Sequence, residues 1–538
     1  MDSSNYNDQQ RSADTKVLHD MGYAQELARS MGRFQNFAIS FSIICIMSGG
    51  INSLGQATSG AGGAAIGFGW PLGCLISLVF ALCLAQISSA YPTAGGLYHW
   101  GSILGNRFTG WLSAWLNLLG LITVLGAINV GTFYFALGAF PELGLQDDVT
   151  HRVAFVAAIT AVMALINHFG IRFTALLTDL SGYLIFATAI AMTLICAASI
   201  TSWDFSRLFT FDNFTGTPGA SAVWPSSVSQ LSAFLLGLLL PIYTITGYDA
   251  SAHTSEETKN AELSVPRGMV SSVIWSAIFG WIMLCAFVLM IPDQATVLDP
   301  ADETKTKMIT LPGMQAAATQ GWSVFFWAMD LTVNPAVKKA LFVAILICQL
   351  LCGLATVTSA SRMIYAFARD GGLPASGFLS KVSPSYRTPV GAIWTGSILQ
   401  ILFVWGTSLV SIGDTSAYSI VVSCTVIFLF LSFTLPIALG LFAYGGPKWP
   451  KMGPWSMGRA LYSLVAILSI LSMALIIYLG VQPPNAWALP ITIGFLVLAG
   501  LVWVLFENSR FKGPPIGEEI KRRQAQIAAA EAAVGERP

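Results

Sequence analysis

No Asp, Glu, Lys or Arg occurs between Arg33 and Arg107. A helix that crosses a bilayer needs about 20 consecutive, mostly apolar residues, so this interval has room for two crossings and the loop between them. The rest of the chain has the same character, with 54% hydrophobic and 10% charged residues and a mean hydropathy of +0.67. Such a chain is too apolar to be soluble, and we predict an all-α integral membrane protein.

Apolar segments of membrane-spanning length recur along the whole chain. About twelve spans are expected, at residues 34–59, 70–90, 110–138, 153–171, 177–200, 231–256, 270–291, 340–362, 390–411, 417–443, 460–480 and 486–506. They divide the chain into an N-terminal tail of residues 1–33, a membrane domain of residues 34–506 and a C-terminal tail of residues 507–538.

Basic residues are distributed unevenly between the two sides that these spans define. If the N-terminus lies inside, most of the 27 Lys and Arg residues fall in inner segments and in the C-terminal tail. Cytoplasmic loops carry this excess of positive charge. We therefore expect both tails in the cytoplasm and a multi-pass protein of the plasma (cytoplasmic) membrane. The net charge of zero gives no indication of a nucleic-acid partner.

Two expected spans are interrupted at matching positions. The apolar run 37–47 ends at a Ser-Gly-Gly sequence, and the run 234–243 ends at the mixed stretch 244–249. Broken helices leave backbone N–H and C=O groups free, which lipid tolerates only where they line a cavity or hold a ligand. A pair of interrupted segments in corresponding halves indicates the binding site of a secondary transporter.

The spacing of the two breaks predicts an internal repeat. Five spans precede the second broken helix, so helices 1 and 6 enter the membrane from opposite sides. This predicts a 5+5 inverted repeat, with residues 34–200 and 231–443 as its halves and residues 460–506 as two added spans.

The residues at the two breaks are the candidates for substrate binding. They are Ser48, Gly49, Gly50, Tyr243, Thr244, Thr246, Gly247 and Tyr248. Free amides at a half-helix end suit a carboxylate, and aromatic faces suit an amine. The plainer alternatives are glycines that let helices pack closely and hydroxyl groups bonded back to their own helix.

Polar side chains within the spans are the candidates for coupling or gating. An intramembrane carboxylate such as Asp249 suggests a function by default: it pairs with a substrate amine, carries a proton, or bonds to backbone at the inner edge. Glu256 and Glu257 are expected at a cytoplasmic gate, with Lys259, Arg267 or Arg362 as partners. Asn117 and Asn129 either contact the substrate or hold helices together. His253 is the one histidine near the second break, where the alternatives are a proton relay and a structural role.

Several motifs follow one another in a consistent order. They are Tyr91-Pro-Thr-Ala-Gly-Gly-Leu-Tyr-His-Trp100, Gly110-Trp-Leu-Ser-Ala-Trp-Leu-Asn-Leu-Leu-Gly120, Gly247-Tyr-Asp-Ala-Ser-Ala-His-Thr-Ser-Glu-Glu257, Val265-Pro-Arg-Gly268 and Ser361-Arg-Met-Ile-Tyr-Ala-Phe-Ala-Arg-Asp-Gly371. Together they resemble the amino acid/choline transporter (GABA permease-like) family of the amino acid–polyamine–organocation superfamily. The resemblance runs from about residue 34 to residue 390, and the hydropathy agrees as far as residue 510.

This resemblance implies further roles for individual residues. Tyr243 resembles the aromatic gate over the substrate in this fold. Asp179 lies close to where related permeases place a coupling cation or proton. Thr358 and Ser359 are similar to the helix 8 hydroxyls that bind sodium in sodium-coupled relatives. Gln86 is a departure, because many relatives have a glutamate there, which argues against a coupling carboxylate at that position.

The function implied is a secondary active transporter that moves an amino acid or related amine, such as GABA, by alternating access. A proton is the expected coupling ion rather than sodium, and the lipid bilayer is the other partner. A choline or polyamine carrier of the same fold is the alternative.

Other classes of protein fit the sequence less well. No cluster of His, Asp or Glu has the spacing of a metal site or of a catalytic set at midplane depth, which argues against a membrane-embedded enzyme. No filter-like repeated loop indicates a channel. No cofactor and no metal ion are expected.

Overall fold

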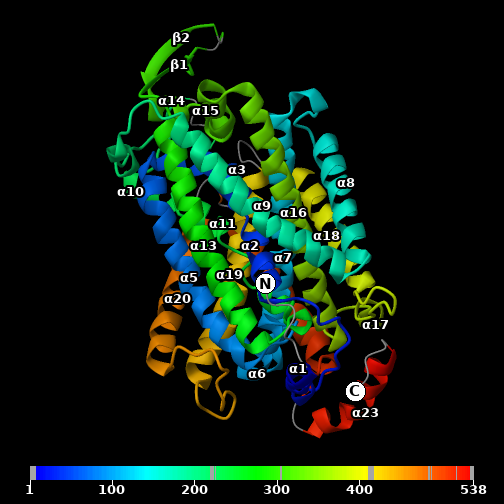
Figure 1. Ribbon diagram of the computed structural model, residues 1–538. Helices are drawn as coiled ribbons and strands as arrows, with labels where there is room; N and C mark the ends of the chain where they lie inside the picture. Colours follow the sequence, from blue (N-terminus) through cyan, green and yellow to red (C-terminus); the bar gives the residue numbers. More distant parts are fainter. Residues whose placement is uncertain are drawn as a thin grey trace.

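The computed structural model describes residues 8–218, 223–224, 226–302, 304, 306–409, 417–482, 485, 487–515 and 518–533. These residues form a bundle of long helices, with a small β hairpin at one end and the helices α1 and α23 of the two tails at the other (Figure 1). Residues 1–7 and 534–538 of the expected tails lie outside the described residues.

The first half of the chain runs from the N-terminal tail to the fifth span. Its helices are α1 (Asp8–Asp20), α2 (Arg33–Ile44), α3 (Gly49–Asn52), α4 (Leu54–Ala61), α5 (Trp70–Ala90), α6 (Leu97–Leu104), α7 (Arg107–Ala139), α8 (Val149–His168) and α9 (Ile171–Ala198). The first span is divided between α2 and the short helices α3 and α4, as the sequence predicts.

The second part of the chain begins with the second interrupted span. Its elements up to the tenth span are α10 (Gln230–Gly237), α11 (Leu239–Thr244), α12 (Ala250–His253), α13 (Ala261–Met290), β1 (Gln294–Leu298), β2 (Met308–Pro312), α14 (Gly313–Ala318), α15 (Val324–Thr332), α16 (Pro335–Arg369), α17 (Ser376–Leu379), α18 (Val390–Leu409) and α19 (Ala417–Ala443). After them come α20 (Arg459–Gly480), α21 (Ala488–Val502), α22 (Asn508–Arg510) and α23 (Glu518–Ala533).

The number of spans agrees with the sequence. Eleven helical segments of the described residues are long and apolar enough to cross a membrane. The expected span 231–256 is missing from this set because it is divided among α10, α11 and α12, none of which is long enough alone. With this interrupted segment the twelve expected spans are all accounted for.

The spans differ greatly in how deeply they are buried. Within the most apolar window of each, 89% of α7 is buried, whereas only 11% of the segment Ala488–Arg510 is buried. α7 packs against α16 and α19, so it is the central helix of the bundle, while α21 contacts α19 from the outside. The exposed apolar side chains of α21 are those that a lipid bilayer would cover.

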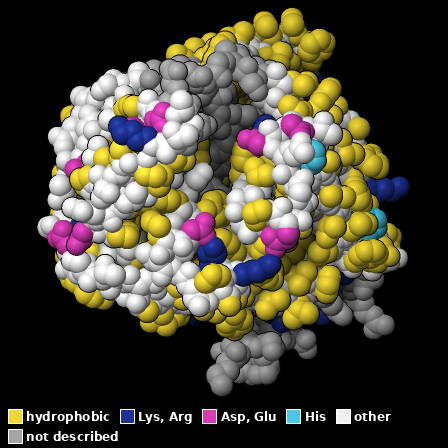
Figure 2. Space-filling view, turned by 90° about the horizontal axis from the view of Figure 1, so that it is seen from above, with side chains coloured by type: hydrophobic (Ala, Val, Ile, Leu, Met, Phe, Trp, Pro, Cys, Tyr) yellow, Lys and Arg dark blue, Asp and Glu magenta, His cyan; other side chains and the backbone are white. Residues whose placement is uncertain are grey.

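The end of the bundle opposite the termini carries a compact cap. β1 and β2 pair antiparallel, with Gln294 opposite Pro312 and Leu298 opposite Met308. α14 and α15 follow the hairpin and pack against α4. Viewed from this end, charged side chains are scattered over the face and hydrophobic side chains gather on its rim (Figure 2).

Candidate substrate and coupling sites

The first break lies between α2 and α3. Cys45 follows α2 with a φ of 28°, a conformation that few non-glycine residues adopt. The backbone N–H groups of Ser48 and Gly49 donate to the carbonyl oxygen of Cys45, at 2.7 and 3.3 Å. These two amides are therefore not free in this conformation, contrary to the expectation that they await a carboxylate.

The second break lies between α11 and α12, where the sequence predicts it. Gly247 has a φ of 83°, in the left-handed region that favours glycine. The hydroxyl group of Thr244 donates to the carbonyl oxygen of Leu240 at 2.7 Å, and that of Thr246 donates to the carbonyl oxygen of Tyr243 at 2.8 Å. Both threonines thus bond back to their own backbone, and each oxygen keeps acceptor capacity for another group.

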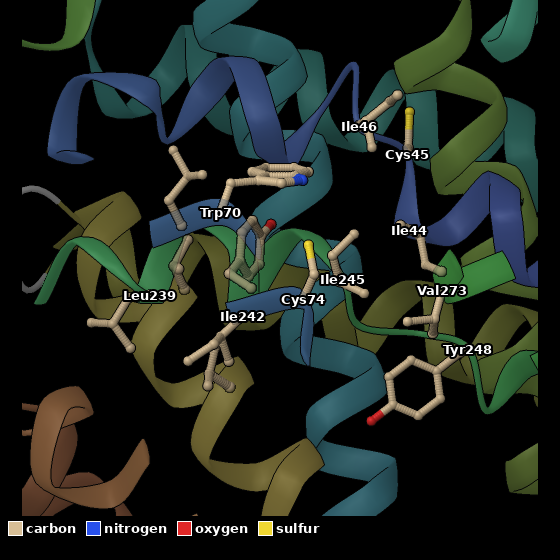
Figure 3. Close-up of a cluster of buried hydrophobic side chains, with 14 of the residues drawn as sticks. Ile44, Cys45, Ile46, Trp70, Cys74, Leu239, Ile242, Ile245, Tyr248 and Val273 are labelled. Carbon is tan, nitrogen blue, oxygen red and sulfur yellow. The ribbon is translucent and has the colours of Figure 1, made fainter. Parts of the chain in front are cut away.

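The two breaks touch each other. A Cβ atom placed on Gly49 would lie 2.6 Å from Oγ1 of Thr244, and one placed on Gly247 would overlap the side chain of Ile43. Each glycine therefore lets the other broken helix approach. Cys45 and Ile46 of the first break belong to the same cluster of buried hydrophobic side chains as Ile245 and Tyr248 of the second (Figure 3).

A small cavity of about 10 Å³ lies between the breaks, which in this closed conformation is about the space of one water molecule. Its lining residues are Ile43, Ile44, Ser48, Gly49, Val124, Ile128, Tyr243, Thr244 and Thr246. All of them are buried, which places the cavity inside the bundle. Its polar groups come from the broken helices, and its remaining wall is aliphatic and comes from α2 and α7.

The cavity brings together five of the eight expected substrate-binding residues, namely Ser48, Gly49, Tyr243, Thr244 and Thr246. The other three, Gly50, Gly247 and Tyr248, are not among its lining residues in the described structure. Gly50 is in the first turn of α3, and Tyr248 packs its ring against Phe433 of α19, with the ring centroids 5.3 Å apart. Val124 and Ile128 are new members that sequence reasoning missed, because an aliphatic residue on a buried helix carries no distinguishing signal.

Asp249 does not line the cavity, but it has the surroundings of an intramembrane functional group. Its side chain is fully buried. Oδ2 accepts a hydrogen bond from Nδ2 of Asn117 at 3.1 Å, and it lies 3.3 Å from Nε2 of His253. The structure therefore joins three of the polar residues that the sequence singled out, one from α7 and two from the second broken helix.

The other expected coupling residues lie apart from the cavity. Asn129 donates to Thr160 of α8, and Thr358 donates to Asn167 of the same helix, at 2.9 and 2.7 Å. The half-buried Asp179 accepts a hydrogen bond from Gln35 at 2.9 Å, beside the first turn of α2. The hydroxyl oxygen of Ser359 is buried and has no partner in the described structure. Interhelical bonding thus accounts for Asn129 and Thr358.

Two thiols occupy the place where α16 passes the first break. Sγ of Cys352 donates to the carbonyl oxygen of Ile43 at 3.3 Å, and Sγ of Cys45 donates to that of Cys348 at 3.7 Å. Nε2 of Gln349 donates to the carbonyl oxygen of Met47 at 3.0 Å. The sequence placed these cysteines in spans but did not indicate that they bond to the broken backbone.

Two buried ion pairs close the end of the site nearest the termini. Arg362 donates two hydrogen bonds to Glu257, at 2.9 and 3.2 Å, and Arg369 donates two to Glu256, at 2.9 and 3.1 Å. The contact between Glu257 and Arg362 is one that the sequence suggested. The contact between Glu256 and Arg369 was missed, because nothing in the sequence distinguishes the arginines at the end of α16. We call these two pairs the inner ion pairs.

The N-terminal tail adds a second layer beside the inner ion pairs. The buried carboxylate of Asp370 accepts hydrogen bonds from the hydroxyl groups of Tyr23 and Tyr98, at 2.6 and 3.0 Å, and lies 3.4 Å from Nε2 of His99. Burial alone would raise the pKa of Asp370, but hydrogen bonds from His99 and Tyr23 and the charge of Arg369 lower it below its ordinary value.

The C-terminal helix packs against the N-terminal tail. Glu531 of α23 lies 2.7 Å from Nε2 of His19 and accepts a hydrogen bond from the backbone N–H of Gln25 at 2.8 Å. Both tails thus lie over the inner ion pairs. Among the described residues, no group of three or more His, Cys, Asp or Glu side chains could hold a metal ion.

Comparison with known proteins adds independent findings. Residues 31–506 match the family model described as "Amino acid permease". The chain is 30% identical over 526 residues to the "Amino-acid permease BAT1 homolog" of Oryza sativa, which covers 92% of this chain and 94% of that protein. It is 29% identical over 516 residues to the "Amino-acid permease BAT1" of Arabidopsis thaliana, with 92% and 95% covered. It is 26% identical over 531 residues to the "GABA-specific permease" of Saccharomyces cerevisiae, with 95% and 87% covered.

Proposed function

The chain belongs to the amino acid permease family, which makes it an amino acid transporter and not an enzyme, and from this premise we propose that it binds its substrate in the cavity between the two broken helices. The observation that carries this proposal is the convergence of both breaks on one buried cavity. Irregular backbone at membrane depth is tolerated where it lines such a space.

The cavity suits a molecule with separated positive and negative groups. The C-terminal ends of α2 and α11, at Ile44 and Thr244, border it with the partial negative charge of helix carbonyls, which attracts an ammonium group. Ser48 and Gly49 line the same space, and their N–H groups, which bond to Cys45 in this conformation, would exchange that bond for one to a substrate carboxylate. Val124 and Ile128 form an aliphatic wall, against which the carbon chain of an amino acid such as GABA would pack once the cavity widens.

Choline and polyamines, the alternative substrates, fit this cavity less well than an amino acid does. A cation without a carboxylate needs a counter-charge, and the sequence offered Asp249 for that purpose. No charged side chain is among the lining residues of the cavity in the described structure, and Asp249 bonds instead to Asn117. The geometry therefore favours an amino acid over choline or a polyamine.

We propose a proton rather than sodium as the coupling ion. Sodium is a hard cation that binds oxygen ligands, whereas thiols are soft ligands. Where α16 meets the first break, Cys348 and Cys352 stand instead of hydroxyl residues, and Thr358 is directed toward Asn167. This arrangement provides few side-chain oxygen ligands for a sodium ion beside the broken helix.

Alternating access would proceed by opening the inner ion pairs. In this structure they are closed and the cavity residues are buried, which corresponds to a conformation closed toward the termini. The excess of basic residues in the segments on that side supports a cytoplasmic location for both tails. On this basis we place the protein in the plasma membrane with the inner ion pairs at its cytoplasmic face.

The experiment that tests this function is competition uptake into proteoliposomes that contain the full chain, with GABA, several α-amino acids, choline and putrescine as competitors. An imposed proton gradient should drive accumulation of an amino acid. Accumulation of choline or putrescine alone would overturn the proposed substrate class. Thr244→Val and Thr246→Val should weaken apparent substrate affinity, since each removes an acceptor oxygen from the cavity wall.

A further inference from the structure

Asp249 and His253 form a buried acidic–basic pair that the substrate cavity does not use. They lie one helical turn apart on the second broken helix, and both side chains are fully buried. Neither lines the cavity. Oδ2 of Asp249 lies 3.3 Å from Nε2 of His253 and accepts a hydrogen bond from Asn117.

The hydrogen bonds of His253 fix one of its protons. Nδ1 lies 3.1 Å from the carbonyl oxygen of Ala94. A carbonyl oxygen only accepts, so Nδ1 carries a hydrogen and donates it. Nε2 is then the nitrogen that faces Asp249, and this nitrogen can either carry a hydrogen or lack one.

Charge balance requires one more proton on the pair. If Nε2 and Asp249 were both unprotonated, two lone pairs would face each other and the pair would carry a buried charge of −1. A buried charge without a partner is costly. One added proton, on either Nε2 or the carboxylate, makes the pair neutral overall and gives it a donor for the 3.3 Å contact.

The surrounding groups do not supply a different neutralising charge. Among the described residues, Tyr248 of the same broken segment interacts with Asp249, Cys83 of α5 lies beside Tyr248, and Glu256 lies beyond Ala94. Both nearby arginines of α16 are already bound to glutamates in the inner ion pairs. Asn117 of α7 and its neighbour Ser432 of α19 are neutral.

The pair and its neighbours Asn117 and Tyr248 carry unpartnered polar atoms. Within the described structure, Oδ1 of Asp249, Oδ1 of Asn117, the hydroxyl oxygen of Tyr248 and Nε2 of His253 are all buried and lack a hydrogen-bond partner. Four such atoms in one place are unusual, because nearly all buried polar groups are bonded. Together they provide the donors and acceptors that a mobile proton and a water molecule require.

We propose that Asp249 and His253 together bind the coupling proton, with Asn117 as the residue that positions the carboxylate. The proposal rests on the proposed function, because it assigns the site of the coupling ion in that transporter. The proton enters with the pair at −1 and brings it to zero charge. It leaves to water on the inner side, which restores the charge of −1.

The position of the pair connects the cavity to the inner ion pairs. Asp249 directly follows the break whose residue Thr246 lines the cavity. His253 bonds to the carbonyl oxygen of Ala94, whose N–H donates to Glu256 at 3.1 Å. Glu256 is itself a member of the inner ion pairs. A change of charge on the pair is therefore transmitted along a short line of hydrogen bonds to the closed end of the site.

The test uses the reconstituted full chain and the variants Asp249→Asn and His253→Gln. Two readouts are compared: accumulation driven by a proton gradient, and exchange of labelled for unlabelled amino acid at equal pH on both sides. A gradient of about one pH unit drives about tenfold accumulation at one proton per substrate. Each variant should keep exchange and lose the accumulation. Asp330→Asn is the control, because this exposed carboxylate pairs with Lys338 and should keep both readouts. Asp179→Asn, which removes the other coupling carboxylate that the sequence suggests, is measured beside it.

The outcomes separate this proposal from the proposed function. Wild-type protein that exchanges no amino acid would overturn the function itself. Wild-type protein that exchanges amino acid but ignores the proton gradient would overturn proton coupling and the coupling site, while the amino acid substrate would stand. The pair would also be rejected if Asp249→Asn still accumulated amino acid in response to the gradient. It would be rejected as well if Asp179→Asn lost this accumulation while both pair variants kept it.

A second measurement tests the proposal if the variant Asp249→Asn does not fold. The number of protons exchanged when substrate binds is measured in weakly buffered detergent solution with a pH dye. We expect one proton per substrate for the wild type and none for the milder variant His253→Gln. A count of zero in the wild type overturns the proposal, and so does an unchanged count in His253→Gln.

Discussion

Gly49 and Thr244 bring the two broken helices into contact. A Cβ atom on residue 49 would lie 2.6 Å from Oγ1 and 2.9 Å from the α carbon of Thr244. Such separations are shorter than atoms tolerate, so the first break packs against the second only because residue 49 has no side chain. The cavity between the breaks depends on this approach.

Gly49→Ala should therefore disrupt transport. The added methyl group forces the broken helices apart, and overpacking of this kind costs about 1–3 kcal/mol. Gly50→Ala is the matched comparison, since a Cβ there has no neighbour nearer than 3.8 Å, in Trp70. Uptake and thermal unfolding of the two variants in detergent would be compared. Equal uptake by both variants would show that the contact with Thr244 is not required.

Gly247→Ala should lower stability through two effects. Its φ of 83° disfavours a Cβ, and the Cβ would overlap Ile43. Gly458→Ala isolates the first effect, because Gly458 has a φ of 81° and no atom within 4 Å of its Cβ position. The left-handed conformation costs an alanine about 1–2 kcal/mol in either variant. Only Gly247→Ala adds the overlap with Ile43, so it should be the more destabilised of the two in denaturation measurements. An equal loss would rule out the contact with Ile43.

Removal of one partner of an inner ion pair should destabilise the closed conformation. Glu257 and Arg362 are both buried, and loss of one partner of a buried pair costs about 3–5 kcal/mol because the other charge stays unpaired. Arg362→Ala should lower the unfolding temperature and open the inner end to thiol reagents. Lys339→Ala is the control, since its ion pair with Glu142 is exposed and should contribute little. A similar change in both variants would contradict a gating role.

Amino acid uptake should not require sodium. Thiols at the first break are poor sodium ligands. Replacement of external sodium by potassium at constant pH should leave the initial rate of uptake unchanged. A rate that falls to background in potassium would show that sodium is bound elsewhere in the protein.

Tyr23→Phe should make the protein more sensitive to acid. The pKa of Asp370 is lowered, so its stabilising contribution is present above the ordinary value of 3.8 and is lost as pH falls through the lowered pKa. Loss of the hydrogen bond from Tyr23 raises that pKa and costs about 1.5–3 kcal/mol. Acid unfolding, followed by intrinsic fluorescence, should therefore begin at a higher pH than in the wild type. The half-exposed Tyr478, changed to Phe, should leave the curve in place.

The sequence was most informative where backbone and side-chain chemistry conflict with lipid. The breaks at 45–48 and 245–249 were visible because glycine and hydroxyl residues interrupt apolar runs. Asp249 and Asn117 were singled out because polar side chains are rare inside spans. Their mutual contact was not predictable, since it joins residues from helices far apart in the chain.

The plain hydrophobic residues gave no such signal. Val124 and Ile128 line the cavity, yet they look like any other residue of a buried span. The thiols of Cys45 and Cys352 have the appearance of small packing residues in the sequence, although each donates a hydrogen bond between α16 and the first break. The expected free amides of Ser48 and Gly49 were wrong for this conformation, because the positive φ of Cys45 turns its carbonyl oxygen toward them.

The sequence by itself determined the class of protein, the twelve spans and the two interruptions, because these follow from local composition and from the cost of placing charge and unpaired backbone in lipid. Only the tertiary structure decided which side chains meet. It placed Asp249 against His253 and not in the cavity, and it paired Glu256 with Arg369. Such contacts depend on how helices cross and rotate, and the apolar periodicity of a membrane helix does not specify that.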